Sequence, residues 1–221
     1  MKKSLYILSF ISSLIFISCS TVSVANYSVG LQSVESPVDE KTQFGETKGV
    51  NFDDNGISKY RYEDDYIDIV WFVDSDRFNF DLKNKTDHTL RINWDDISYV
   101  NYAGQVKRVI HSGIKYSETS SIQPATNIPK GTSLVDVLVP DENIEFIGDE
   151  LSWKVDYLIP SVYKTPEEFN AEDGATSYVG KTLKIVMPIM IQNVQNDYIF
   201  TFKIEELLNS VYSKCKIVNE N

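Results

Sequence analysis

Apolar and polar residues alternate with a period of two along most of this chain. Phe78, Phe80 and Leu82 alternate with Asn79 and Asp81, so that the apolar side chains share one face of an extended segment. The same pattern predicts strands over residues 27–34, 66–73, 77–82, 90–94, 97–102, 106–110, 134–139, 153–159, 183–191 and 198–204. Polar turns separate these segments, which is typical of an antiparallel sheet.

The segment 153–159 shows what the alternation implies for packing. Trp153, Val155, Tyr157 and Ile159 fall at every second position, so we expect all four side chains to point inward. Strands that each hide one face are stable when two such faces stack. The pattern therefore predicts a mainly β chain that folds as an antiparallel, Ig-like β-sandwich with one or two short helices.

Two segments have a helical pattern. Thr165-Pro166-Glu167-Glu168 offers an N-cap, a proline at the first helical position and a glutamate at the third. Near the C-terminus, apolar residues from Ile204 to Cys215 fall at helical spacing. We expect one short helix in each place.

The first eighteen residues have the pattern of a secretory signal. Lys2 and Lys3 precede the apolar run Leu5 to Ile17. As a helix this run would reach about 20 Å, against about 30 Å for the hydrocarbon core of a bilayer, so it is short for a membrane span. A charged start followed by a short apolar run predicts a signal peptide over residues 1–18.

The cysteine that follows defines the expected site of processing. Phe16-Ile17-Ser18-Cys19 resembles the lipobox of bacterial lipoproteins, and the resemblance implies that Cys19 becomes the acylated N-terminus of the mature protein. An alternative is ordinary cleavage after Ser23-Val24-Ala25, which would release a soluble protein beginning at Asn26. We favour lipidation because a cysteine at the end of the apolar run is otherwise hard to explain, and two or three acyl chains anchor a protein firmly.

Composition then limits the partners. Loss of Lys2 and Lys3 with the signal leaves 19 basic and 32 acidic residues, a net charge of −13. This negative charge argues against binding to nucleic acid and against binding to anionic lipid through a polybasic segment. Attachment to the membrane should therefore come from the N-terminal lipid. Cys215 would have no intramolecular partner and is expected to be a packed or idle thiol.

The chain divides into three expected parts. After the signal, residues 19–57 are polar and turn-rich, and we interpret them as a tether and loops with one strand. Residues 58–221 should form the β-sandwich domain.

Few residues could carry chemistry. The sequence contains none of the local motifs for hydrolases, nucleotide binding or zinc proteases, so we lean against an enzyme and expect no catalytic residue, metal or cofactor. Asp95, Asp96 and His111 could form a general acid/base set or a metal site. Neighbouring strand residues point to opposite faces, so the interpretation we prefer is that Asp95 and Asp96 end a strand and begin a turn.

The stretch Val106 to Tyr116 contains one of only two histidines. Gly113 predicts a bulge or turn after His111, and we expect His111 to hold this turn by donating to a carbonyl or to Asp95. Tyr116 closes the stretch and stays a further site candidate.

The middle of the chain resembles a family of uncharacterised bacterial envelope proteins, many of them lipoproteins. The motifs lie between Phe78 and Pro140 and comprise Asn84-Lys85-Thr86, Trp94-Asp95, Gly104, Arg108-Val109, His111, Gly113, Tyr116, Ile128-Pro129, Gly131 and Pro140. The resemblance implies a β-sandwich in the cell envelope, and it implies no activity and no functional residues.

Together these observations favour a lipoprotein anchored to the bacterial outer membrane, on its periplasmic side, that serves as a non-catalytic binding or structural module. An envelope protein or a glycan is the expected partner. The alternative is a hydrolase or a metal-dependent carbohydrate-binding protein that uses Asp95, Asp96 and His111.

Overall fold

The computed structural model describes residues 18–35, 50–54 and 56–216. Apart from Ser18, the predicted signal peptide lies outside these residues. All strand pairs among them are antiparallel, and the strands form a β-sandwich, as the alternating pattern predicted.

One layer contains the two longest strands. Its members are β1 (Ser18–Glu35), β6 (Leu90–Ile92), β7 (Ser98–Val100), β9 (Thr126–Ile128), β13 (Val162–Tyr163), β14 (Thr182–Ile191) and β15 (Val194–Lys216). They follow the order β13-β1-β15-β14, after which β14 pairs with both β7 and β6, and β6 pairs with β9.

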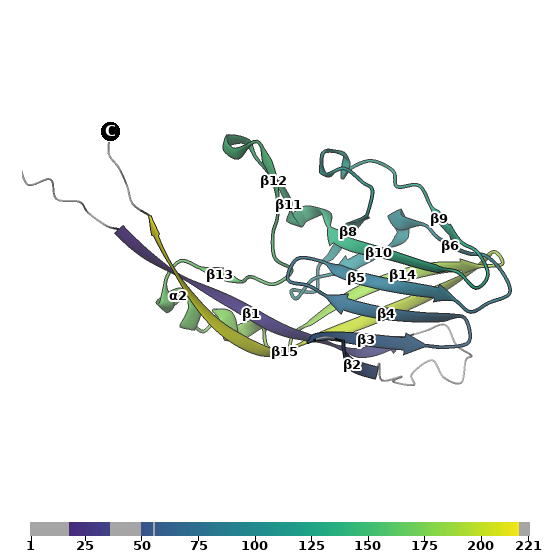
Figure 1. Cartoon of the computed structure of the whole chain (residues 1–221), viewed down its shortest axis with the longest axis horizontal. Helices are drawn as coiled ribbons and strands as arrows, with labels where there is room; N and C mark the ends of the chain where they lie inside the picture. The colour runs from purple at the N-terminus through teal and green to yellow at the C-terminus, as the bar shows by residue number, and fades with distance from the viewer. Residues whose placement is uncertain (1–17, 36–49, 55, 217–221) are drawn as a thin grey trace, which may run out of the picture.

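The second layer lies across the first (Figure 1). Its members are β2 (Val50–Asp54), β3 (Ile57–Glu63), β4 (Ile67–Val73), β5 (Phe78–Asn84), β8 (Val106–His111) and β10 (Ser133–Pro140). They follow the order β8-β10-β5-β4-β3-β2, and β8 joins the two layers because it also pairs with β7. A separate hairpin of β11 (Ile144–Ile147) and β12 (Ser152–Val155) projects from the sandwich (Figure 1).

Aromatic side chains join the layers. The Trp71 ring on β4 lies 4.9 Å from the Phe200 ring and 5.6 Å from the Phe202 ring, both on β15, between ring centroids. Phe78 on β5 lies 5.2 Å from Phe202. All of these side chains are fully buried, so they supply a large apolar area and fix how the layers pack.

The short helices are single turns that connect the strands. The α-helix α2 (Pro166–Asn170) begins where it was predicted, and the Thr165 hydroxyl accepts a hydrogen bond of 3.2 Å from the Glu168 amide. The 3₁₀ turns are η1 (Trp94–Asp96), η2 (Tyr116–Glu118), η3 (Asp141–Asn143), η4 (Gly148–Glu150) and η5 (Ala175–Tyr178).

The predicted C-terminal helix is wrong. Residues 204–216 continue β15, which pairs with β1 from Ser18↔Lys216 to Glu35↔Ile199 with two register shifts. The two strands run past the rest of the sheet as a two-stranded ribbon (Figure 1). Pairing with a strand nearly 200 positions away overrides the local helical spacing, and that partner strand begins nine residues before the strand predicted at Tyr27.

The prediction for segment 153–159 is wrong for Trp153 and Tyr157, whereas Ile159 is buried as predicted. The strand β12 ends at Val155, and the side chains of Trp153 and Tyr157 are 41% and 40% exposed. Because the hairpin projects from the sandwich, neither of its faces is covered by a layer, and alternation there does not report burial.

Candidate functional site

His111 lies at the end of β8 and is held by two neighbours. Its ring stacks on the buried Trp94 ring with centroids 3.9 Å apart, and its Nδ1 lies 3.2 Å from Asp136 Oδ2. The imidazole is 13% exposed, and among the described residues its buried Nε2 has no hydrogen-bond partner. Gly113 has a φ of +89°, which confirms the turn that needed glycine.

The expected partner of His111 is corrected by this geometry. The His111 imidazole contacts Asp136 on β10 and neither a carbonyl nor Asp95. The reason is that β10 pairs directly with β8 at this level. Asp136 Oδ1 also accepts the amides of Ser112 and Val137 at 2.8 and 2.7 Å. Burial raises the pKa of Asp136, but the hydrogen bonds from His111, Ser112 and Val137 favour the carboxylate more strongly and hold the pKa below its ordinary value.

Asp95 has a separate set of partners. Its Oδ1 lies 2.7 Å from a guanidinium nitrogen of Arg108, and its Oδ2 accepts the Gln123 amide at 3.2 Å. Burial raises its pKa, and the bonds from Arg108 and Gln123 lower it to below the ordinary range. The Gln123 side chain also accepts the His111 amide at 3.2 Å, so Asp95 and His111 are linked only through a buried glutamine that the sequence analysis missed.

Asp96 and Tyr116 point elsewhere. Asp96 Oδ2 accepts a hydrogen bond of 2.7 Å from the Asn93 side chain, and both aspartates lie in η1, the turn after β6, as the preferred interpretation predicted. Tyr116 packs against Trp153 of the projecting hairpin with ring centroids 6.2 Å apart. Within residues 18–35, 50–54 and 56–216, no group of three His, Cys, Asp or Glu side chains is arranged to hold a metal ion.

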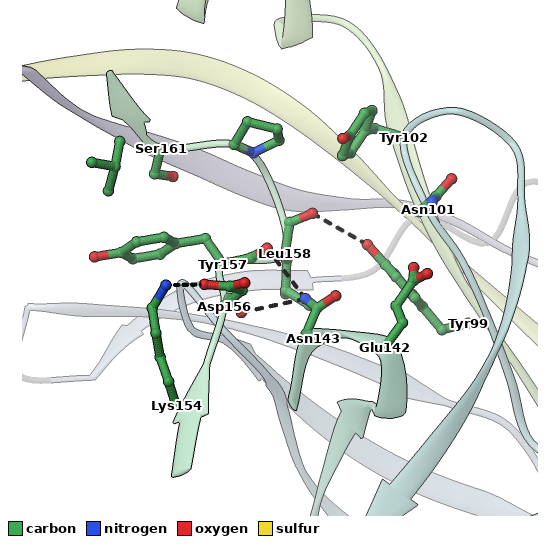
Figure 2. A pocket seen from close by; sticks show the side chains of 12 residues that line it. Tyr99, Asn101, Tyr102, Glu142, Asn143, Lys154, Asp156, Tyr157, Leu158 and Ser161 are labelled. Atoms are coloured by element: carbon green, nitrogen blue, oxygen red, sulfur yellow. Dashed lines mark hydrogen bonds and ion pairs between the residues drawn. The ribbon is translucent and has the colours of Figure 1, made fainter. Parts of the chain in front are cut away.

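A cavity of about 600 Å³ lies where the β11–β12 hairpin joins the sandwich. Figure 2 shows Tyr157 and Lys154 on one side of segment 156–158, and Tyr99 and Tyr102 on the other. We call it the tyrosine cavity, and it is lined by Tyr99, Asn101, Tyr102, Glu142, Asn143, Lys154, Asp156, Tyr157, Leu158, Pro160, Ser161 and Val162.

Hydrogen bonds hold segment 156–158 in place across the cavity. The Asn143 amide group donates to the carbonyls of Asp156 and Tyr157 at 3.3 and 3.2 Å. On the other side the Tyr99 hydroxyl donates to the Leu158 carbonyl at 3.5 Å (Figure 2). The segment is thus fixed to both η3 and β7. Tyr157 is therefore an exposed side chain on a backbone that hydrogen bonds hold in place.

The charged side chains of the cavity are paired. Lys154 contacts Asp156, and Glu142 contacts Lys107, which lies next to the cavity on β8. Tyr99 and Tyr102 have pKa values raised chiefly by burial, so their hydroxyls are neutral at physiological pH. The cavity therefore offers aromatic rings, hydroxyls and amides. Each charged side chain described in its lining is paired with an opposite charge.

The sequence signal for this cavity was weak. Tyr99 belongs to a predicted strand and is buried, whereas Tyr157 was predicted to be buried and is 40% exposed. Pro160 follows closely and ends the alternation, and this was the one local sign that the strand stops before Tyr157.

Comparisons with known proteins add no relative. No family model, curated protein or solved structure matches this chain. Among the residues that the structure describes, no helix is both long and apolar enough to cross a bilayer.

Proposed function

We propose that this chain is a lipid-anchored module of the bacterial cell envelope that binds a neutral saccharide in the tyrosine cavity without catalysis. The observation that carries the proposal is the cavity itself, in which half-exposed tyrosine lies beside amide and paired charged groups. Anchoring through Cys19 and the place on the periplasmic side of the outer membrane stay predictions from the sequence.

The position of β1 supports cleavage before Cys19 over cleavage before Asn26. Cleavage before Asn26 would remove Ser23 and Ala25, which are only 4% and 1% exposed. It would also remove the part of β1 that pairs with β13 and with residues 209–216 of β15. Cleavage before Cys19 removes only the terminal pair Ser18↔Lys216 and leaves the others in place.

The chemistry of the cavity favours a saccharide. Sugar rings carry hydroxyls that both donate and accept, and they have apolar C–H faces that pack on aromatic rings. Tyr102 and Tyr157 supply rings and hydroxyls, and Asn143, whose amide nitrogen is bound to backbone carbonyls, supplies its side-chain oxygen as an acceptor. A charged ligand would have to compete with the Lys154–Asp156 and Lys107–Glu142 pairs, so an uncharged ligand fits better.

No described contact favours the alternative of a hydrolase or a metal-dependent protein. Asp95 is held by Arg108, Asp96 by Asn93 and His111 by Asp136, and the three side chains do not converge.

The test is a binding titration with xylotetraose and cellotetraose, followed by calorimetry or by protein chemical shifts. We expect at least one of the two sugars to bind, and we expect Tyr157→Ala to weaken that binding by about tenfold, or about 1.4 kcal/mol. Tyr66→Ala is the matched control, because Tyr66 is also 40% exposed but lies outside the cavity. Binding of neither sugar, or equal effects of the two substitutions, would contradict the proposal.

A further inference from the structure

A second hollow, of about 650 Å³, shares no lining residue with the tyrosine cavity. It lies over β9, β6 and β14 and the turn that joins β14 to β15. We call it the Arg91 groove, and it is lined by Thr89, Arg91, Asn93, Asp96, Ile122, Gln123, Pro124, Ala125, Asn127, Met190, Gln192 and Asn193.

Arg91 lies at the centre of this groove because of its register. It is directly opposite Met190 on one side and Asn127 on the other. Its neighbours Leu90 and Ile92 are fully buried, so Arg91 points to the outer face of the layer. The arginine, the methionine and the asparagine thus form a row across three strands.

Arg91 differs from the other arginines of the chain. The sequence has four, and the structure describes all of them. Arg61 binds Asp68, Arg77 binds Asp76 and Arg108 binds Asp95, each with a nitrogen to oxygen distance of 2.7 Å. Among the described residues Arg91 has no such ion pair and no hydrogen bond from its side chain, although the chain has 32 acidic residues. A guanidinium has a fork of donors that matches a carboxylate, and here that fork is open to a ligand.

Amide side chains surround the arginine. Asn127 lies beside it on β9, and Asn193 and Gln192 form the turn after β14, where both have positive φ values of 66° and 49°. Asn93 borders the groove with its amide nitrogen bound to Asp96, which leaves its carbonyl oxygen to accept. The Gln192 amide nitrogen contacts His88, whereas the amides of Asn127 and Asn193 offer both donors and acceptors, as hydroxyl groups require.

We propose that the Arg91 groove binds a saccharide that carries a single carboxylate, such as a uronic acid residue. The Arg91 guanidinium takes the carboxylate in a two-bonded arrangement, and Asn127 and Asn193 take neighbouring hydroxyls. Met190 and Pro124 contact the apolar face of the ring.

The charge of the chain favours an acidic sugar over an acidic peptide. The whole sequence has a net charge of −11, and Asp96 borders the groove beside its one arginine. Several carboxylates on one ligand would be repelled, whereas one carboxylate surrounded by hydroxyls matches one guanidinium surrounded by amides.

The experiment uses two tetrasaccharides, of which only one carries a carboxylate. Xylotriose with a single 4-O-methylglucuronic acid branch is titrated against the full chain in detergent, beside xylotetraose. We expect the acidic sugar to bind about tenfold more tightly, and we expect Arg91→Gln to abolish this difference while Arg91→Lys keeps part of it. Lys115→Gln removes the same charge from a side chain that is 75% exposed and outside the groove, and it should leave the difference unchanged.

Three results would overturn the proposal. They are equal affinity for the two sugars, an unchanged preference in Arg91→Gln, and tighter Arg91-dependent binding of a glutamate-containing tetrapeptide, which would make the groove a peptide site. Tyr157→Ala serves as a second control, because it alters the tyrosine cavity and should leave the preference for the acidic sugar intact. The two binding proposals can therefore fail separately.

Discussion

The contacts of His111 join β8, β10 and η1, and they support a structural role for this residue. The sequence predicted a structural histidine beside a glycine turn; the turn is confirmed, and the structural role stays a prediction. Its partner Asp136 could not be predicted, because the pairing of β10 with β8 brings together residues 25 positions apart. The local sequence therefore indicates that His111 has a hydrogen-bond partner but does not identify Asp136 as that partner.

We expect His111→Ala to lower the free energy of unfolding by about 2 kcal/mol or more. The substitution removes the ring that stacks on Trp94 and leaves the buried Asp136 carboxylate without one of its donors. Thermal and urea melts measure the loss. His88→Ala is the control, since the only other histidine is exposed and should cost less than about 0.5 kcal/mol. Equal losses in the two variants would contradict a framework role.

The stability of the protein should depend on Asp136 in acid. Its pKa in the folded state lies below the value of about 3.9 expected for the unfolded chain, so the folded state favours the ionised form. This contribution is complete above the unfolded pKa and is lost as the pH falls through the lower, folded pKa. Urea melts from pH 6 down to pH 2 should therefore show a shallower acid loss for Asp136→Asn than for the parent. Parallel curves would show that Asp136 titrates normally.

At the scale of elements, the strands with a covered face were predictable and the exposed ones were not. The alternating segments that became β4, β5 and β14 have buried residues at every second position. By contrast, all five residues of β2 are exposed, so no alternation marks that strand, although Asn55-Gly56 is a hairpin signal that could have found it. Segment 156–158 belongs to the same class, because side-chain hydrogen bonds and single backbone bonds to Asn143 and Ser75 fix it, and it has no strand pairing.

The ribbon of β1 and β15 gives a direct test of register. The backbone register places Cys19 opposite Cys215. Directly opposed positions of antiparallel strands lie close enough for a disulfide. A chain made from Ser18 onward in a reducing cell, then treated with oxidised glutathione, should lose two thiols to one intramolecular disulfide while two glutathione molecules are released.

The control moves the thiol by one position. In the double variant Cys215→Ser with Lys214→Cys, the new cysteine is in register with Ser20 and no longer with Cys19, so the intramolecular crosslink should disappear. Mass spectrometry of non-reduced peptides distinguishes the outcomes. Only intermolecular dimers in the unsubstituted chain would show that the register is different.

In the whole molecule, the ribbon of β1 and β15 would connect the proposed lipid anchor on Cys19 to the sandwich. Because β1 pairs with β15 from its first residue, a lipid on Cys19 would lie at the end of the ribbon that runs past the sheet (Figure 1). The tyrosine cavity and the Arg91 groove are both lined by residues outside the ribbon end that would carry the lipid. A lipid there would therefore leave both sites uncovered. The sequence predicted the anchor and the sandwich, but the continuity between them depends on long-range pairing that local pattern does not show.

The most direct test of this account is the mass of the N-terminal peptide of the protein extracted from bacterial membranes. The account predicts a mature chain that begins at Cys19 and carries acyl chains. In Cys19→Ser, the peptide that contains position 19 should carry no acyl chain. A mature chain that begins at Asn26, or an unmodified Cys19 in membrane-bound protein, would contradict the account.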